Sequence, residues 1–306
     1  MNLQFKPIEA SDVEKITPFY ALRPNKTCDS VYLDCFIWRE YYHVKYAISD
    51  NKALQFLMEK DGQPFTAMPM CREEDLPYYF NEMKEYFNEV LKKPLRISLA
   101  DQAAIEYLKL DPDQFEVIEV DDLKDYLYDA QSLRTLAGKK LHKKKNHLNS
   151  FLKEYEGRYE YRNLCCSDRD SVVEFLNEWW ENKVEAAEFT RQLDYEVMGI
   201  HSILKNCSFL NVRMAGVFID GVLKAFTIGS YNSFEKMAVI HIEKADPDIK
   251  GLYQFINQQF ITHAYPEELI LVNREDDVGM EGLRKAKMSY YPVDFARKYS
   301  VVQKGF

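Results

Sequence analysis

The stretch Lys236–Tyr265 constrains the fold of this chain most, because it reads as a strand, a tight turn and a helix in direct succession. From Met237 to Ala245 the residues alternate between two faces with the period of a strand. Asp246-Pro247-Asp248 is typical of a turn, since proline fixes its own φ and aspartate side chains bond nearby backbone. Gly251 then opens a predicted helix. A helix that begins just after a strand directs unpaired N–H groups at one point, where an anion can bind.

The elements predicted around this stretch form a definite order. The second half reads as strand, two helices, three strands, helix, strand, helix and strand, and the first half contains a looser version of the same meander. An antiparallel meander followed by a parallel strand–helix–strand pair is the element order of a GNAT-type N-acyltransferase. We therefore expect an α+β fold with mixed sheets, made of two tandem GNAT-like domains over residues 1–132 and 133–306. A basic linking helix over residues 133–155 leads into the second.

Composition narrows the class of protein. A net charge of −9 argues against a protein that coats nucleic acid. Six cysteines include no C-x-x-C pair, and the adjacent Cys165 and Cys166 are poorly placed to bridge each other, so we expect reduced, buried thiols. No secretion signal is visible, and no apolar run approaches the ~18 residues of a membrane helix. These features predict a cytoplasmic protein without integral membrane association.

Positive charge is concentrated in the predicted linking helix. Residues 130–153 contain no acidic residue and seven Lys or Arg. Lys140, Lys143 and Lys144 are among the cations that surround an apolar stripe running from Leu133 to Tyr155. The helix is either a solvated charged surface or a face that binds a polyanion, such as a tRNA backbone, cofactor phosphates or anionic lipid headgroups. It lacks interleaved aromatic residues, so base stacking is not indicated.

Three segments carry a resemblance to a known family: LAGKKLHKKKNHLNSF, HIEKADPDIKGLYQFINQQF and LVNREDDVGMEGLRKAKMSYYP. They resemble the C-terminal domain of phosphatidylglycerol lysyltransferases and its uncharacterised stand-alone relatives. More distantly they are similar to Fem-type aminoacyltransferases, which also pair two GNAT-like domains. The resemblance implies transfer of an acyl or aminoacyl group to an amine or hydroxyl on a small-molecule or peptide acceptor. The donor would be acyl-CoA or aminoacyl-tRNA, with no permanently bound cofactor. The large membrane-embedded part of the lysyltransferases is not in this sequence, which weakens the expectation of a lipid acceptor.

The pyrophosphate loop departs from the usual GNAT pattern Q/R-x-x-G-x-G/A. Aligned on Gly251, the chain has Asp248 in place of Gln or Arg and Tyr253 in place of a small residue. A carboxylate repels a phosphate, and a tyrosine blocks close approach to the backbone. Lys250 still offers a positive charge, so Lys250, Gly251 and Lys287 are the candidate cofactor-binding residues. The departure makes acetyl-CoA a weaker candidate than in a usual GNAT enzyme. Aminoacyl-tRNA, the donor that the resemblance implies, fits the basic helix better.

Two residues of the central strand are candidates for catalysis. By strict alternation, His241 and Glu243 share one face of the strand. A glutamate beside a histidine can hold its tautomer or act as a base. The alternative is a histidine that is simply hydrogen-bonded within a sheet.

Further candidates follow the next strand. Asn273 ends it and is able to donate to an oxyanion, and Asp276 lies at the mouth where α/β sheets place ligands. By resemblance, GNAT enzymes hold a tyrosine that acts as general acid in this region, which Tyr290 or Tyr291 matches. Crowded charges at a strand end are also typical of an ordinary loop.

Other chemistries lack their motifs. The sequence contains no nucleophile elbow and no P-loop, and its histidine spacings do not indicate a metal site. Trp179 and Trp180 are interpreted as core or interface residues. Two rival hypotheses remain: a non-catalytic GNAT-fold module that binds an anionic ligand or RNA, and a peripheral contact of the basic helix with an anionic membrane.

Overall fold

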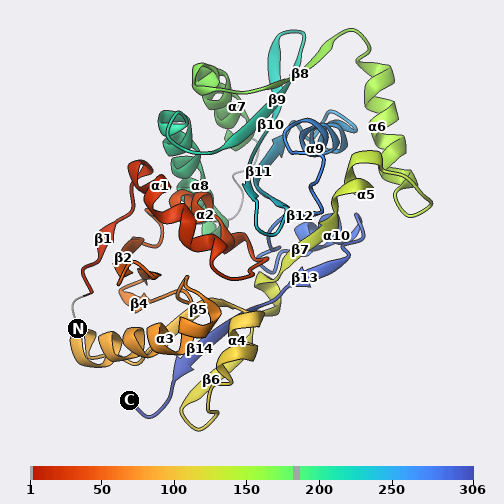
Figure 1. Cartoon of the computed structure of the whole chain (residues 1–306). Coiled ribbons are helices and arrows are strands. Elements are labelled where there is room, and N and C mark those ends of the chain that lie inside the picture. Colours follow the sequence, from red (N-terminus) through yellow and green to blue (C-terminus); the bar gives the residue numbers. More distant parts are fainter. Residues whose placement is uncertain (1–2, 182–186) are drawn as a thin grey trace. The chain divides into compact units, whose positions relative to one another are not determined.

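The computed structural model describes residues 3–181 and 187–306 (Figure 1). The chain forms two compact units. The first comprises Met1–Asp125, Asp276–Gly279 and Phe295–Phe306, and the second comprises Tyr126–Glu275 and Met280–Asp294. The units therefore part between Asp125 and Tyr126, earlier than the boundary expected after residue 132, and the C-terminal residues return to the first unit.

The first unit contains two small sheets. One has the order β1-β2-β3-β4 and is antiparallel, with strands β1 (Lys6–Pro7), β2 (Lys45–Ser49), β3 (Ala53–Lys60) and β4 (Gln63–Phe65). The other has the order β5-β14-β6, with strands β5 (Arg96–Asp101), β14 (Lys298–Gln303) and β6 (Phe115–Glu119). The last strand of the chain thus pairs on both sides with strands from the first half.

Apolar residues of the first unit gather between its sheets and helices. The helices are α1 (Val13–Ile16), α2 (Tyr32–Ile37), α3 (Leu76–Glu85) and α4 (Gln102–Leu108). Met83 and Phe87 pack with Ile97 and Val301 in one buried cluster. Burial of such side chains at roughly 1.5–3 kcal/mol each supplies most of the favourable free energy of folding.

The second unit is built on a seven-stranded sheet with the order β13-β7-β12-β11-β10-β9-β8. Its strands are β7 (Asp125–Asp129), β8 (Tyr159–Asn163), β9 (Arg213–Ile219), β10 (Val222–Asn232), β11 (Met237–Ala245), β12 (Leu271–Asn273) and β13 (Asp294–Ala296). The predicted meander is β9, β10 and β11, which pair antiparallel, and β11 and β12 form the predicted parallel pair. Strand β7 was not predicted; it pairs antiparallel with β12.

Helices cover both faces of this sheet. They are α5 (Ala130–Thr135), α6 (His142–Glu154), α7 (Arg169–Glu181), α8 (Ala187–Asn206), α9 (Leu252–His263) and α10 (Glu281–Met288). Figure 1 shows α7 and α8 on one side of β9–β11 and α9 with α6 on the other. Two neighbouring residues of β11 contact helices on opposite faces of the sheet. Lys244 contacts Glu196 of α8 and Trp179 of α7. Glu243 accepts a hydrogen bond from Asn257 of α9. The Trp180 side chain lies outside the described residues.

The basic segment is not the single helix predicted over residues 133–155. Helix α5 ends at Thr135, Leu136 has a φ of 47°, Gly138 has a φ of 86°, and α6 starts only at His142. The break arises because the left-handed conformation at Leu136 ends the helix. Gly138 adopts a second left-handed conformation, which costs glycine little free energy. Lys139 and Lys140 therefore lie in a turn, and Lys143 and Lys144 in the first turn of α6.

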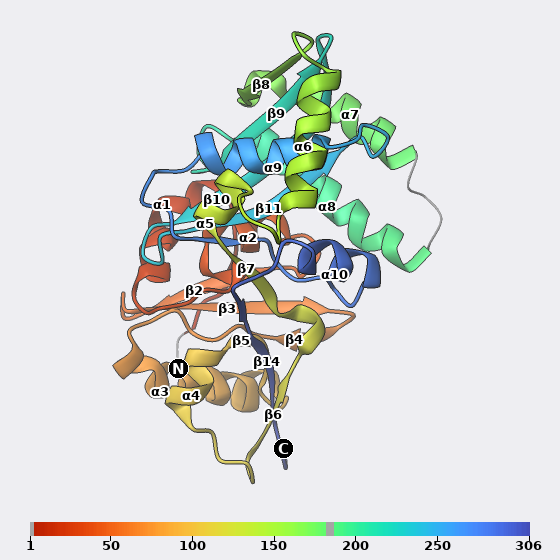
Figure 2. The same cartoon turned by 90° about the vertical axis from the view of Figure 1, so that its right-hand side faces the viewer.

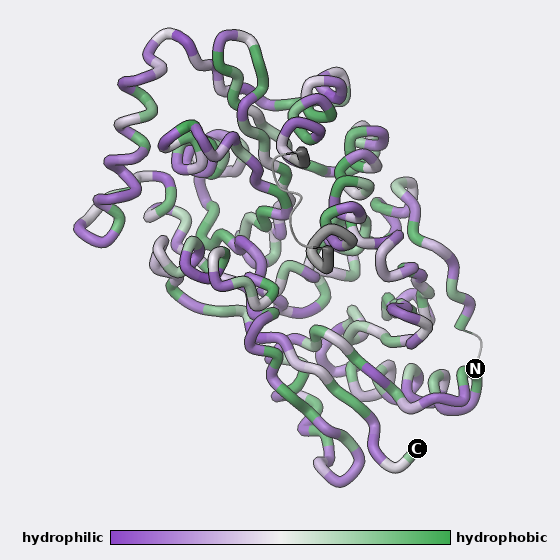
Figure 3. Tube along the Cα trace, turned by 180° about the vertical axis from the view of Figure 1, so that it is seen from behind, coloured by the Kyte–Doolittle hydropathy of each residue, from purple (hydrophilic) through white to green (hydrophobic). Residues whose placement is uncertain are grey.

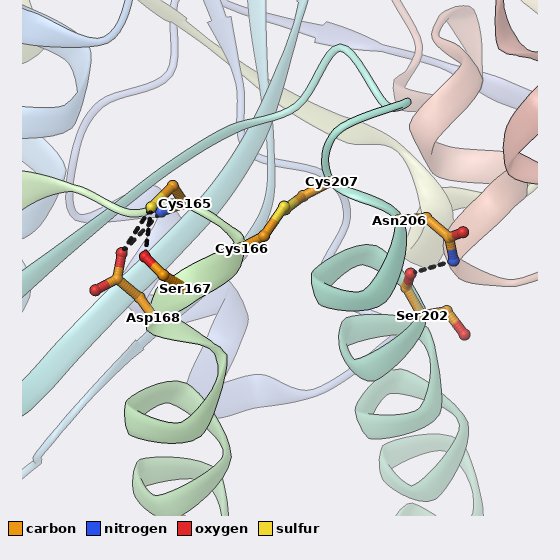
Figure 4. The surroundings of a disulfide bond; sticks show 7 residues. All are labelled: Cys165, Cys166, Ser167, Asp168, Ser202, Asn206 and Cys207. Carbon is orange, nitrogen blue, oxygen red and sulfur yellow. Dashed lines mark hydrogen bonds between the residues drawn. A yellow bond between two sulfur atoms is a disulfide. The ribbon is translucent and has the colours of Figure 1, made fainter.

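A disulfide joins Cys166 and Cys207, which corrects the expectation of six reduced thiols (Figure 4). Cys166 lies just before α7 and Cys207 just after α8, so the bond closes the ends of this helical pair. Adjacent Cys165 stays a free, exposed thiol whose backbone N–H donates to Asp168. Sequence spacing could not reveal the bond, because a separation of 41 residues is bridged only by the packing of α7 and α8.

Candidate active site

The site starts where β11 and β12 separate. The two parallel strands pair at Met237–Leu271, Ala238–Val272 and Val239–Asn273, and β11 then continues to Ala245 beyond the end of β12. Side chains of the last part of β11 and of the residues after β12 therefore meet at an opening edge of the sheet. This is the position at which the GNAT-like pattern predicts the acyl group.

His241 is the extra residue of a β-bulge. In the pairing of β10 with β11, Ile228 lies opposite Ile242 and Gly229 opposite Ile240, which leaves His241 unpaired. Bulges re-aim side chains and break strict alternation. Gly229 needs to be glycine, because a Cβ there would lie 2.2 Å from the Tyr265 hydroxyl and 2.7 Å from the Val239 carbonyl oxygen.

The expectation that His241 and Glu243 share one face is wrong, and the bulge is the reason. His241 Nε2 lies 2.9 Å from Ser230 Oγ, and its Nδ1 lies 2.8 Å from Glu275 Oε1. Glu243 pairs instead with Thr227, which is three residues from Ser230 on β10 and so points to the other face. The carboxylate beside the histidine is therefore Glu275, a partner that the sequence analysis missed.

Glu243 anchors a polar cluster on the α9 face. Its Oε1 accepts a hydrogen bond from Arg274 Nη2 and its Oε2 one from Asn257 Nδ2, both at 2.8 Å. Burial works to lower the pKa of Arg274, yet Glu243 beside it holds that pKa above its ordinary value. The buried ion pair fixes the guanidinium at the opening of the sheet.

Tyr290 lies against this guanidinium. Arg274 Cζ is 4.9 Å from the centre of the Tyr290 ring, and Gln254 of α9 lies beside the Tyr290 hydroxyl. Burial raises the pKa of Tyr290, and Arg274 opposes part of that rise. Tyr291, the other candidate general acid, is 49% exposed and packs under Lys140. Of the two tyrosines, Tyr290 is the one that the structure brings to Glu243 and Arg274.

Helix α6 brings Lys144 to the same ring. Lys144 Nζ lies 4.3 Å from the centre of Tyr290, whereas Lys143 and Lys145 are exposed. Burial, and next the charge of Arg274, lowers the pKa of Lys144. The predicted polyanion-binding lysines thus separate into an inward residue, Lys144, and outward ones.

The start of α9 is covered by α6. A Cβ on Gly251, whose φ is 86°, would lie 2.1 Å from the carbonyl oxygen of His147 and 3.0 Å from Cβ of Phe151. Phe151 also contacts Phe255, with ring centres 4.7 Å apart and the ring planes tilted by 34°. Figure 2 shows α6 lying across α9. Lys250 is exposed beside this contact. One side of the loop where a CoA pyrophosphate would be expected is therefore occupied by protein backbone.

The remaining predicted residues hold the loop after β12. Asn273 is fully buried, and its Oδ1 accepts from the backbone N–H of Glu275. Lys287 Nζ donates to the carbonyl oxygen of Arg274 at 2.7 Å. Asp276 belongs to the first unit, where its Oδ2 lies 3.7 Å from the buried Lys298 amine. Only Glu243, Tyr290, Lys144 and Lys287 of the predicted set gather around Arg274.

Several members of the cluster escaped sequence analysis. Gln254 and Asn257 are three residues apart on α9, and Tyr128 lies on the unpredicted strand β7 with its ring 5.8 Å from Arg274 Cζ. Gln254 and Asn257 lie among several polar residues of α9, so spacing alone does not single them out. No sequence signal pointed to Tyr128, because strand β7, on which it lies, was not predicted.

Comparisons with known proteins indicate the family and the fold. A family model described as phosphatidylglycerol lysyltransferase, C-terminal, matches residues 21–302. An uncharacterised protein of Mycoplasmoides gallisepticum is 25% identical over 177 residues, which cover 58% of this chain and 55% of that protein. The match thus spans about half the length of this curated relative.

Solved structures share the fold to different degrees. A conserved protein of unknown function from Bacteroides thetaiotaomicron is 29% identical with a TM-score of 0.90, covering 99% of this chain and all of that one. L-PGS from Bacillus licheniformis is 14% identical with a TM-score of 0.71, covering 100% and 95%. A tandem GNAT protein from the clavulanic acid pathway is 12% identical with a TM-score of 0.50, covering 100% and 99%. The predicted α+β, tandem GNAT-like fold is confirmed.

Within the described residues, every helix is too short or too polar to cross a lipid bilayer.

Proposed function

We propose that this protein, which belongs to the family of phosphatidylglycerol lysyltransferase C-terminal domains, transfers an aminoacyl group from aminoacyl-tRNA to an amine or hydroxyl acceptor in the cytoplasm. Its acyltransferase-like fold is that of the family. The choice of donor is supported by one observation above all: α6 contacts Gly251 where an acyl-CoA would place its pyrophosphate, and it presents lysines to solvent beside that contact.

The exposed lysines favour a large anionic donor. Among the described residues, Lys139, Lys143 and Lys145 have no carboxylate partner, and all three are exposed. Figure 3 shows α6 as a largely hydrophilic helix. Unbalanced positive charge on a protein of net charge −9 attracts a polyanion and leaves a strong salt dependence of binding.

Tyr290 is the proton donor in the proposed reaction. The acceptor attacks the ester carbonyl of the aminoacyl group, and the ester C–O bond then breaks. Tyr290 gives its proton to the leaving ribose oxygen, and the acceptor's proton passes to solvent. Because burial raises the pKa of Tyr290, the phenol is protonated at neutral pH. Arg274 stabilises the phenolate that forms for a moment.

Glu243, His241 and Asn273 act as positioning residues in this proposal. Glu243 holds Arg274 against Tyr290, and Asn273 orders the turn that carries Arg274. His241 ties the bulge of β11 to Glu275, the residue that follows Arg274. Both nitrogens of His241 and both oxygens of Glu243 are bonded within the protein, so the direct roles assigned to these two residues from sequence become indirect.

The test compares two adjacent tyrosines. A pool of tRNA charged with radiolabelled amino acids is incubated with the protein, and loss of label from tRNA is followed together with the label that appears in acceptors. Tyr290→Phe keeps the ring and removes the proton, so discharge should slow by roughly 100-fold. Tyr291→Phe, at the exposed neighbour, should react like the unaltered protein. Equal rates for both variants would remove Tyr290 from the chemistry.

A non-catalytic binding module is the second candidate. It is favoured by the fact that both oxygens of Glu243 are engaged by Arg274 and Asn257. This candidate predicts that charged tRNA binds with a strong salt dependence and keeps its aminoacyl group. The discharge assay therefore separates it from the transferase.

A further inference from the structure

Two cations contact a single aromatic ring in the second unit. Lys144 Nζ lies 4.3 Å and Arg274 Cζ 4.9 Å from the centre of Tyr290. Glu243 balances the charge of Arg274. Nothing balances Lys144: among the described residues it forms no ion pair and no hydrogen bond, although its side chain is half-buried. The cluster therefore carries one excess positive charge that is partly shielded from solvent.

A second donor in the cluster is also unused. Nη1 of Arg274 is shielded from solvent and has no hydrogen-bond partner among the described residues. Buried polar groups are nearly always satisfied, and the exceptions frequently mark the place of an absent water, ion or ligand. The cluster thus combines an excess charge and an unused donor around Tyr290.

A packing role does not account for these features. Lysine at this half-buried position loses hydration and gains only the contact with the Tyr290 ring, so an apolar residue of similar length would be at least as stable there. The neighbouring lysines of α6 avoid this cost because they point to solvent. A ligand with negative charge would satisfy both Lys144 and the free nitrogen of Arg274.

We infer that Lys144, Arg274 and Tyr290 form a binding site for a phosphodiester group. A guanidinium and an ammonium together suit a tetrahedral oxyanion, which accepts hydrogen bonds from several directions. This site would bind the phosphate of a substrate of the proposed transfer reaction. The inference rests on the proposed function only for the identity of the molecule that supplies the phosphate. Two sources share the chemistry: the last phosphodiester of a tRNA 3′ end and the headgroup of a phospholipid.

Binding is measured with probes that carry no acyl group. Phosphate binding can therefore be detected even if the protein does not catalyse transfer. The probes are inorganic phosphate, the dinucleotide CpA and glycerophosphoglycerol. Each is titrated into the protein at constant low ionic strength, and binding is measured by the shift in melting temperature and by calorimetry. The variants are Lys144→Met and, as a matched control at an exposed lysine in the last turn of the same helix, Lys153→Met. The site predicts at least a 10-fold weaker affinity for Lys144→Met and an unchanged affinity for Lys153→Met.

Stability without ligand supplies an independent readout. Lys144→Met removes an unpaired half-buried charge, so the ligand-free variant should melt at or above the temperature of the unaltered protein while it loses its response to phosphate. Preferential binding of CpA would identify the nucleic-acid source, and preferential binding of glycerophosphoglycerol the lipid source. Equal losses for both lysine variants, or no binding of any probe to the unaltered protein, would overturn the site.

Discussion

At the scale of single residues, partners rather than spacing decide what a side chain does. Spacing alone placed His241 and Glu243 on one face, whereas a single extra residue in β11 sends them to different partners. A bulge depends on the register with the neighbouring strand, and register is not visible in one strand's sequence. The resemblance to GNAT enzymes offers Tyr290 or Tyr291 as general acid, and a resemblance of this kind does not depend on register.

Gly251 tests the contact between α6 and α9. Gly251→Ala places a methyl group 2.1 Å from the His147 carbonyl oxygen and also forces alanine to a φ of 86°. Gly138 has the same φ with open space around it, so Gly138→Ala reports the conformational cost alone. Urea unfolding should show a loss of about 1–2 kcal/mol for Gly138→Ala and a clearly larger one for Gly251→Ala. Equal losses would mean that α6 moves away from the loop in solution.

Lys144 gives stability a characteristic dependence on pH. Its pKa is lowered in the folded protein, so the unfolded chain binds more protons between that lowered pKa and the ordinary 10.5. The free energy of unfolding therefore rises with pH through this window. Lys144→Met should flatten the rise, and Lys145→Met should preserve it. A pH profile of unfolding that is identical in the two variants would contradict the burial of Lys144.

At the scale of elements, most helices and strands of the second unit were predictable and their boundaries were less so. The alternation of β9, β10 and β11 and the helical spacing of α9 are strong local signals. The break between α5 and α6 was missed because the apolar stripe continues across Gly138. Strand β7 was missed because it is short and starts and ends with aspartate, which strands disfavour.

The Cys166–Cys207 disulfide makes the α7–α8 pair sensitive to reduction. Closing a loop of this length is worth about 4 kcal/mol through the entropy of the unfolded chain. Cys207→Ser should lower the unfolding free energy by about that amount, and Cys165→Ser, at the exposed free thiol, should change it little. Thiol titration of the denatured, unreduced protein should find free thiols on four of the six cysteines. Six free thiols and no effect of reductant would show that the bond does not form.

At the scale of the whole molecule, the order of elements was enough to predict the fold and, with three sequence segments, the family. Strand pairings between residues distant in sequence were not predictable and are known only from the structure. Strand β14 pairs with β5 and β6 some two hundred residues earlier in the chain, and no local pattern encodes such a partner. The cluster around Arg274 is likewise assembled from α6, α9, β7, β11, the loop after β12 and the turn after α10. Sequence analysis found its individual members where a motif or charge run marked them, and it missed those that only tertiary packing supplies.

The choice of donor is tested most directly by single-turnover discharge of two substrates under matched conditions. Labelled aminoacyl-tRNA and labelled acetyl-CoA are each mixed with excess protein at low and at high salt, and release of the acyl group is followed in time. We expect discharge of aminoacyl-tRNA that weakens steeply with salt, because α6 binds the backbone through exposed lysines, and no discharge of acetyl-CoA. Discharge of acetyl-CoA with aminoacyl-tRNA left intact would contradict the proposed reaction, since it would place a CoA pyrophosphate where α6 covers Gly251.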